Sequence, residues 1–288
     1  MKSLKTINSL VVKGALALGI IAMLFATSCQ QSAENPSFTD FESTELDAIA
    51  EADFDEIDDI TESALGYADG SIGGRTSGRG MDERASCATV THDKDAQTIR
   101  INFGDACTGP YGVTRSGVIF INYIGKRFVP GSSWTVTFQN FYINDRHIEG
   151  IRTVENVSDS LEANPKFHIA LVGGKVTWPS DTFATREVNR YREWVRASNP
   201  MDDEMLILEG SIASGINKNG VNYSSTVLTN LVYKRMCRNT ARIPVQGIKE
   251  VIVGDAISLI DFGDGECDSM ATITTNGKSK SVDLSKRN

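Results

Sequence analysis

The sequence predicts an all-β protein, an antiparallel meander that forms a large sandwich or a curved, half-barrel sheet. Three observations support this fold class. From about residue 85 onward, short segments alternate apolar and polar residues, as strands do when one face is buried. Turn signals separate these segments at intervals of about ten residues. No alternation of strand-like and helix-like segments occurs, which disfavours an α/β enzyme.

Residues 1–28 have the organisation of an export signal. Three lysines open the segment, and an uncharged apolar run follows at residues 15–25. This run is too short to cross a bilayer comfortably, and no later stretch is long and apolar enough to do so. Small residues then lead directly into Cys29, so we expect the mature protein to be exported.

The residues Ala26-Thr27-Ser28-Cys29 resemble the lipobox of bacterial lipoproteins. The resemblance implies cleavage before Cys29, diacylation of its thiol and acylation of the new amino group. Two or three acyl chains anchor a protein stably, whereas one chain binds reversibly. Ala26 stands where a lipobox usually has leucine, and the same residues suit the ordinary signal peptidase, so an unlipidated exported protein is the alternative. Gln30, in place of aspartate, favours the outer membrane.

Residues 29–84 are expected to form a tether that is acidic and then rich in glycine. The chain has a formal net charge of −8, and residues 30–74 contain thirteen acidic residues without Lys or Arg. Apolar residues at helical spacing predict a short amphipathic helix in this segment: Leu46, Ile49, Phe54, Ile57 and Ile60. The remainder should be solvated and should repel the anionic membrane surface.

Residues 85–288 are expected to form the β domain. The strand candidates lie at 99–103, 118–123, 134–138 with 141–143, 148–157, 166–172, 175–178, 205–211, 222–227, 251–253, 256–262, 271–275 and 278–284. The turn signals between them are Asn144-Asp145, Gly173-Gly174, Asn219-Gly220 and Asn276-Gly277, and the last two are typical of two-residue hairpins. The domain is nearly neutral, which allows an anionic partner, whereas the acidic chain as a whole disfavours nucleic acid.

Two segments of the β domain resemble each other, INFGDAC at 101–107 and IDFGDGEC at 260–267. In each, an apolar strand ends, a glycine permits a sharp turn, an aspartate caps it and a cysteine follows. The four cysteines beyond Cys29 are most simply two disulfides in an exported protein. Three pairings exist, and we favour Cys87–Cys107 with Cys237–Cys267 because each joins neighbours. A metal site is disfavoured because there is no CxxC and the histidines are isolated.

The segment REVNRYREWVR at 186–196 contains the most suggestive surface. As a strand, it would place Arg190, Arg192, Trp194 and Arg196 on one face. Such a face suits an anionic glycan or a lipid headgroup, through bidentate hydrogen bonds and stacking. As a helix, the segment would leave its arginines solvated. Its Val, Tyr and Trp residues favour the strand.

We assign no catalytic residue and no cofactor. His92, His147 and His168 lack a Ser or Cys partner in a recognisable nucleophile motif, and no G-x-S-x-G occurs. The expected function is a non-catalytic binding or structural domain. The alternatives are a carrier that encloses lipid or another hydrophobic ligand and, less favoured, a glycan-active enzyme whose two carboxylates come from distant strands.

Ser28-Cys29, the acidic segment and the echoes at 103–107 and 262–268 together resemble a family of Bacteroidota outer-membrane lipoproteins. The resemblance implies an envelope location and a membrane contact through the anchor, with an anionic glycan or an envelope protein as partner. It implies no activity. Bacteria of this group attach O-glycans at Asp-Ser/Thr followed by a small or aliphatic residue, so Ser160 and Ser269 are candidate glycosylation sites.

Overall fold

In the part of the chain that the structure describes, one long helix is followed by a single antiparallel sheet of 14 strands. The computed structural model describes residues 38–68, 82–109, 112–239 and 243–284, with helix side chains described from Asp53 onward. The predicted signal peptide, Cys29 and residues 69–81 of the glycine-rich segment lie outside the described residues. The single sheet confirms the all-β fold class.

The helix α1 spans Phe38–Ala68. The strands are β1 (Thr89–Asp93), β2 (Thr98–Thr108), β3 (Thr114–Ile124), β4 (Ser133–Ile143), β5 (Arg146–Asn156), β6 (Lys166–Thr177), β7 (Phe183–Val195), β8 (Glu204–Ile207), β9 (Ile212–Ile216), β10 (Asn222–Lys234), β11 (Gln246–Val253), β12 (Ala256–Asp264), β13 (Met270–Thr275) and β14 (Lys278–Asp283).

Sequence neighbours pair throughout the sheet, so the chain is a meander with one irregularity. β8 and β9 both pair with β7 on one side and β10 on the other. They act as one interrupted strand, whereas the sequence predicted a continuous strand at 205–211. The predicted strand at 186–196 is β7, which confirms the strand alternative over the helix.

The turn signals have mixed outcomes. Asn276-Gly277 forms a two-residue hairpin in which both residues have positive φ, as predicted. Asn144-Asp145, predicted only as a turn, forms a hairpin of the same kind. Asn219-Gly220 instead lies in a five-residue connection, because Ile216 pairs with Asn222. The prediction of a turn at Gly173-Gly174 is wrong, since β6 continues through both residues.

A line of β-bulges crosses strands β2 to β6. Residues with positive φ mark it on successive strands: Gly104, Gly117, Asn140, Gly150 and Gly173. The strand registers shift at each of these positions. A bulge bends its strand and increases the local twist. Aligned bulges therefore bend the sheet along one line. Gly173-Gly174 forms one of these bulges, which explains why β6 continues through the two glycines.

The two echoing segments adopt the same local structure. The amide of Gly104 donates to Asn102 Oδ1 at 3.1 Å, and that of Gly263 donates to Asp261 Oδ1 at 2.9 Å. The cap therefore comes from the residue two positions before the glycine, and not from the aspartate after it as predicted.

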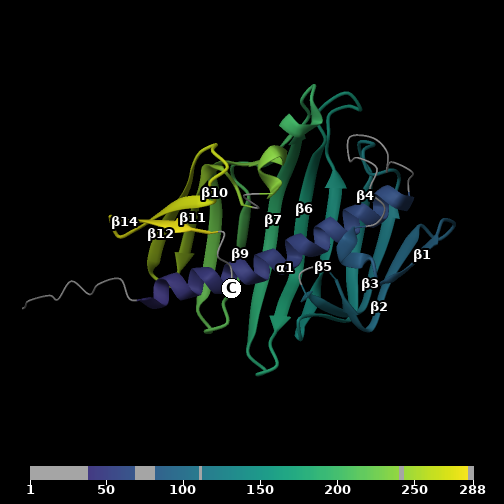
Figure 1. The fold of residues 1–288 in the computed structure, drawn as a ribbon, viewed down its shortest axis with the longest axis horizontal. Helices are drawn as coiled ribbons and strands as arrows, with labels where there is room; N and C mark the ends of the chain where they lie inside the picture. Colours follow the sequence, from purple (N-terminus) through teal and green to yellow (C-terminus); the bar gives the residue numbers. More distant parts are fainter. Residues whose placement is uncertain (1–37, 69–81, 110–111, 240–242, 285–288) are drawn as a thin grey trace, which may run out of the picture. The chain divides into compact units, whose positions relative to one another are not determined.

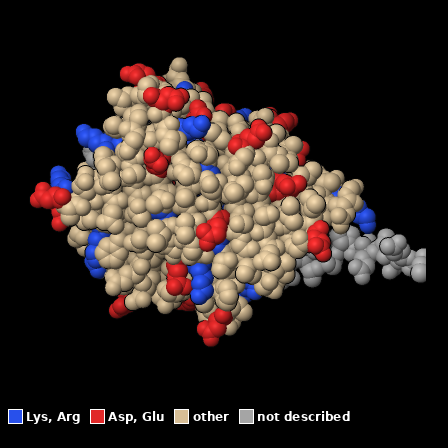
Figure 2. All heavy atoms as spheres, turned by 180° about the vertical axis from the view of Figure 1, so that it is seen from behind, with Lys and Arg blue, Asp and Glu red and all other residues tan. Residues whose placement is uncertain are grey.

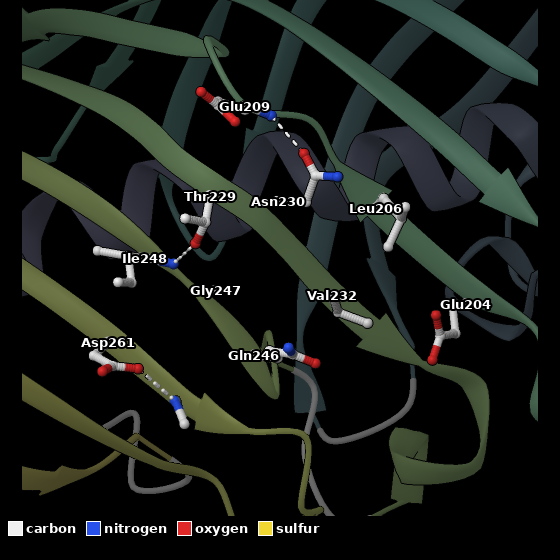
Figure 3. A pocket seen from close by; sticks show the side chains of 11 residues that line it. Glu204, Leu206, Glu209, Thr229, Asn230, Val232, Gln246, Gly247, Ile248 and Asp261 are labelled. Carbon is white, nitrogen blue, oxygen red and sulfur yellow. Dashed lines mark hydrogen bonds between the residues drawn. The ribbon is translucent and has the colours of Figure 1, made fainter.

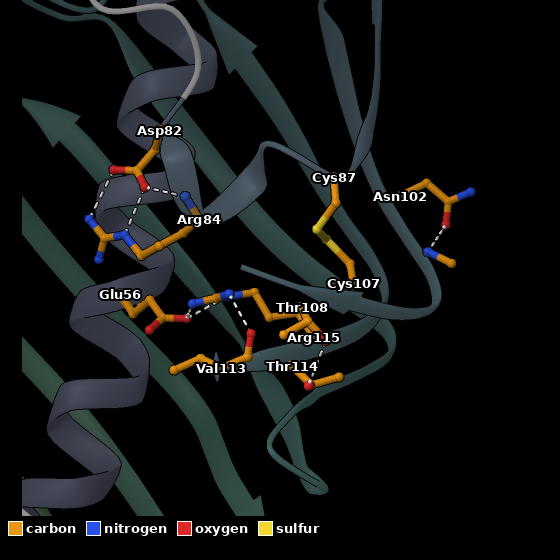
Figure 4. Close-up of a disulfide and its surroundings, with 11 residues drawn as sticks. Glu56, Asp82, Arg84, Cys87, Asn102, Cys107, Thr108, Val113, Thr114 and Arg115 are labelled. Carbon is orange, nitrogen blue, oxygen red and sulfur yellow. Dashed lines mark hydrogen bonds and ion pairs between the residues drawn. A yellow bond between two sulfur atoms is a disulfide. The ribbon is translucent and has the colours of Figure 1, made fainter. Parts of the chain in front are cut away.

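The cysteines near each echo form disulfides. The bonds are Cys87–Cys107 (Figure 4) and Cys237–Cys267, the pairing that the sequence favoured. They close loops of 20 and 30 residues, for which loop closure contributes roughly 3 kcal/mol each.

Helix α1 lies across one face of the sheet, here called the inner face (Figure 1). Phe54, Ile57 and Ile60 are at most 2% exposed and pack with inner-face residues of β2 to β7 in the largest core cluster. These are the described members of the predicted apolar stripe. The opposite, outer face carries scattered acidic and basic side chains among uncharged ones (Figure 2). Helix and sheet therefore share one core.

We expect Gly117→Ala to destabilise the protein much more than Gly104→Ala. Both glycines have positive φ, 84° and 65°, which costs an alanine about 1–2 kcal/mol. At Gly117 a Cβ would also lie 1.9 Å from the carbonyl oxygen of Asn140, whereas Gly104 faces open space. Urea denaturation should show that Gly117→Ala loses at least twice as much unfolding free energy as Gly104→Ala. Equal losses would contradict the close approach at the bulge line.

Candidate functional site

The acidic residues of α1 bind arginines of the sheet and of the segment before it. The bonded pairs are Arg84–Asp59, Arg115–Glu56, Arg146–Asp53, Arg152–Asp58, Arg190–Asp55, Arg190–Asp58, Arg192–Asp58 and Arg192–Glu62. The expectation of a solvated acidic tether is therefore wrong for the described half of the helix. We expected the acidic side chains of the helix to be solvated because the sequence does not show what the helix packs against.

The two most buried arginines in the described part of the chain both have their carboxylate partner on α1. The side chains of Arg115 and Arg152 are each 1% exposed. Arg115 contacts Glu56 at 2.7 Å and also donates to the carbonyl of Val113 (Figure 4). Arg152 is bonded to Asp58, whose side chain is 9% exposed. Burial lowers the pKa of Arg152, and the Asp58 carboxylate opposes that decrease. A buried charge without its partner is strongly destabilising, so these arginines require the helix.

Two of the four predicted ligand residues are used by this interface. Arg190 and Arg192 do share one face of β7, as predicted, and Tyr191 is exposed on the other face. That shared face, however, is the inner face. Arg190 contacts Asp55 at 2.9 Å, and Arg192 is bonded to Glu62. The prediction that these two arginines form an open ligand surface is therefore wrong: their anionic partner is the chain's own helix.

The other two predicted residues, Trp194 and Arg196, lie together at the end of β7. The guanidinium carbon of Arg196 is 5.4 Å from the centroid of the Trp194 ring and 5.9 Å from that of Phe128. The two ring centroids are 5.6 Å apart. All three side chains are partly exposed. We call Phe128, Trp194 and Arg196 the rim cluster, because they lie where the strand ends.

The rim cluster adjoins the far end of the helix interface. Arg127, beside Phe128, donates from Nη1 to the carbonyl of Glu62 at 2.8 Å. Arg192 binds the carboxylate of Glu62. Burial tends to raise the pKa of Glu62, but the attraction of Arg192 and Arg127 outweighs it, so the pKa lies below its ordinary value. The Glu62 carboxylate is thus bonded to Arg192 and not to Arg196.

The histidines sit on the sheet with polar or aromatic neighbours. His92 Nε2 lies 2.6 Å from the hydroxyl of Tyr123, and His168 Nε2 lies 2.9 Å from Asn189 Oδ1. The ring of His147 stacks on Tyr142, with centroids 4.7 Å apart. Within the described ranges, no group of three or more His, Cys, Asp or Glu side chains is arranged to hold a metal ion.

The two candidate glycosylation sites have different surroundings. Ser160 is exposed in the connection between β5 and β6, where its hydroxyl accepts a hydrogen bond from the amide of Ala163 at 3.3 Å. Glycosylation there stays a prediction. Ser269 is only 6% exposed and has positive φ. The structure contradicts it as an acceptor in the folded protein, because a glycan needs an accessible hydroxyl.

A depression of about 670 Å³ opens on the outer face over β8, β10, β11 and β12 (Figure 3). Three of its polar side chains accept hydrogen bonds from backbone amides: Asn230 from Glu209, Thr229 from Ile248 and Asp261 from Gly263. The register of β10 and β11 shifts at this place. The depression is therefore a consequence of the bulges in these strands.

What sequence reasoning missed is the pairing between two segments far apart in the chain. Residues 53–62 carry the carboxylates, and their arginine partners are spread from Arg84 to Arg192. The available signal was complementarity: a helix rich in acid and an inward-facing strand rich in arginine in the same chain. The two segments were interpreted separately: the acidic helix as solvated, and the arginine-rich strand as a ligand surface.

Comparisons with protein-family models, with curated proteins and with solved structures found no match. Among the described residues, no helix combines the length and the apolar run that a membrane crossing requires. The functional argument therefore rests on the residues themselves.

We expect Asp58→Asn to lower the unfolding free energy by about 3–5 kcal/mol, because it leaves the buried Arg152 uncompensated. Asp55→Asn is the matched control on the same helix. The Asp55 side chain is 47% exposed, so its loss should cost about 1 kcal/mol or less. Chemical denaturation of both variants measures the difference. A small effect of Asp58→Asn would contradict the dependence of Arg152 on the helix.

The stabilisation from Glu62 should depend on pH. Its pKa is lower in the folded chain than its ordinary value of 4.5, so folding favours the ionised form. That stabilisation is present above the ordinary pKa and is lost as the pH falls through the folded pKa. We therefore expect Glu62→Gln to reduce Tm more at pH 7 than at pH 3. Glu162→Gln, at an exposed position, is the control and should leave Tm unchanged at both pH values. Equal losses of Tm for Glu62→Gln at pH 7 and pH 3 would contradict the stabilisation by ionised Glu62.

Proposed function

We propose that this protein is a lipid-anchored, non-catalytic binding module of the outer membrane. The anchor rests on the resemblance of Ala26-Thr27-Ser28-Cys29 to a lipobox. The observation that carries the rest is the inner face of the sheet, which the chain's own helix occupies through apolar contacts and ion pairs. A sheet whose inner face is used for its own folding presents its outer face and its rims to other molecules.

The same observation disfavours the carrier alternative. A carrier of this architecture would keep the inner face open for a hydrophobic ligand. Here Phe54, Ile57 and Ile60 of α1 fill that place and are at most 2% exposed. A ligand would have to displace the helix, and displacement would expose the buried charges of Arg115 and Arg152. That cost favours a permanent core over a ligand cavity.

The docked helix also changes where the module stands relative to the membrane. The helix begins at Phe38, nine positions after Cys29. Nine residues span at most about 30 Å even when fully extended. A lipidated Cys29 would therefore hold the sheet close to the bilayer, whereas a solvated tether as long as 29–84 would allow a much greater distance. Contacts with envelope polymers near the membrane are the expected consequence.

We expect Cys29→Ala to abolish fatty-acid labelling and to release the protein from the membrane fraction, because the thiol is the proposed acylation site. The double variant Cys87→Ser, Cys107→Ser is the matched control, since it removes two other cysteines and should stay labelled. Metabolic labelling followed by fractionation is the measurement. Labelling that persists in Cys29→Ala would refute the anchor.

Native mass spectrometry separates the module from the carrier. The wild-type protein, extracted gently from its envelope, should have the mass of the acylated chain without a further bound lipid. A stoichiometric lipid that is retained by Cys29→Ala would contradict the module and support the carrier. The variant serves as the control because it lacks the covalent chains, which leaves only non-covalent lipid to be detected.

A further inference from the structure

We propose that the rim cluster of Phe128, Trp194 and Arg196 binds an acidic sugar, a carboxylate or phosphate group carried on a polysaccharide of the envelope. This inference rests on the proposed binding module and names its ligand class. The Arg196 guanidinium would bind the anionic group, and the rings would contact the sugar to which that group is attached.

The first argument is the charge left over when the helix has docked. Arg190 and Arg192, on the same face of β7, are bonded to carboxylates of α1. Arg196 forms no ion pair in the described part of the chain, and its side chain is partly exposed. Its backbone amide donates to Asn164 Oδ1 at 3.2 Å. Of Arg190, Arg192 and Arg196, Arg196 is thus the one whose guanidinium is not bonded to a carboxylate of the described residues.

The second argument is how the guanidinium is held. The ring centroids of Trp194 and Phe128 lie 5.4 and 5.9 Å from the guanidinium carbon and 5.6 Å from each other, so the two rings adjoin it side by side. Aromatic rings attract a cation without using its hydrogen-bond donors. They also reduce the freedom of a long side chain, so less entropy is lost when a ligand binds. The planar fork is therefore positioned for a carboxylate or phosphate, which it can bind through two hydrogen bonds.

The third argument is the electrostatic environment. Arg127 and Arg192 lie beside the cluster. Arg127 donates to the backbone carbonyl of Glu62, and Arg192 binds the Glu62 carboxylate. Glu193, the residue between Arg192 and Trp194, extends toward the outer face, where Asn164 Nδ2 donates to it at 3.3 Å. Asp203 Oδ1 accepts from the amide of Ala197, next to Arg196, and Asp203 Oδ2 lies 3.7 Å from Arg235. The carboxylates near Arg196 are therefore bonded to other groups, which leaves its guanidinium for an anionic ligand.

The observations favour a sugar over a lipid surface. Recognition of an anionic bilayer uses several clustered Lys and Arg residues. The rim cluster offers one unpaired guanidinium and two large rings, which suits a single acidic group on a flat, partly apolar body. Aromatic side chains are able to contact such a body while the arginine binds its charge. Anionic vesicles thus become the contrasting arm of the test.

Affinity electrophoresis of the soluble Cys29→Ala chain tests this assignment with defined probes: polygalacturonate, phosphomannan and neutral mannan. We expect retardation by at least one of the two acidic polymers and none by neutral mannan. Arg196→Ala should weaken that binding about tenfold, in line with the loss of a charge-assisted hydrogen-bonded contact. Arg196→Lys should be intermediate, because it keeps the charge but loses the planar fork.

Arg100→Ala is the matched control. Arg100 lies on β2 and faces away from the inner face, between the buried Ile99 and Ile101. Its loss removes the same charge and should leave retardation unchanged. Trp194→Phe, which keeps a ring, should bind better than Trp194→Ala. Unchanged Tm values for the Arg196 variants establish that a loss of binding does not reflect unfolding.

Three outcomes would overturn the rim cluster as an acidic-sugar site. These are no retardation of the wild-type chain by either acidic polymer, equal weakening by Arg196→Ala and Arg100→Ala, or binding to phosphatidylglycerol vesicles in preference to both polymers. None of them affects the anchor or the lipid content of the native protein, which the labelling and mass measurements report. Failure of the sugar site and failure of the proposed function are therefore distinguishable.

Discussion

The buried ion pairs between α1 and the sheet are the constraint on which the rest of the structure depends. Arg115 and Arg152 extend from β3 and β5 into the core and are 1% exposed. A guanidinium in that position is tolerable only beside a carboxylate, and Glu56 and Asp58 provide it from the helix. The helix is thus part of the β domain, and its acidic composition serves the fold.

The line of bulges gives the sheet the shape that receives this helix. Gly117 approaches the backbone of β4 so closely that a Cβ would lie 1.9 Å from a carbonyl oxygen. At Gly174, a Cβ would similarly lie 2.4 Å from the carbonyl oxygen of Arg186 on β7. Bulges increase twist, so aligned bulges bend neighbouring strands together. Glycines inside strands therefore have a structural role that local turn propensity does not reveal.

Local pattern predicted much of the sheet and part of the candidate site. The alternation of residues in β7 correctly placed Arg190, Arg192 and Trp194 on one face, because side chains alternate along any strand. The polar strand β1 was missed, since Thr89–Asp93 has little apolar alternation. Gly173 was assigned to a turn because positive φ serves a bulge as well as a turn.

The sequence by itself determined the antiparallel sheet and the shared face of the β7 arginines, because both depend on residues close in the chain or on a period of two. It favoured the disulfide pairing among three without deciding it. Only the tertiary structure decided what that face meets. The docking of α1 uses Arg190 and Arg192 and leaves Arg196 with Trp194 at the rim. Charge complementarity between distant segments becomes a contact only when the sheet brings them together, and no local pattern encodes that.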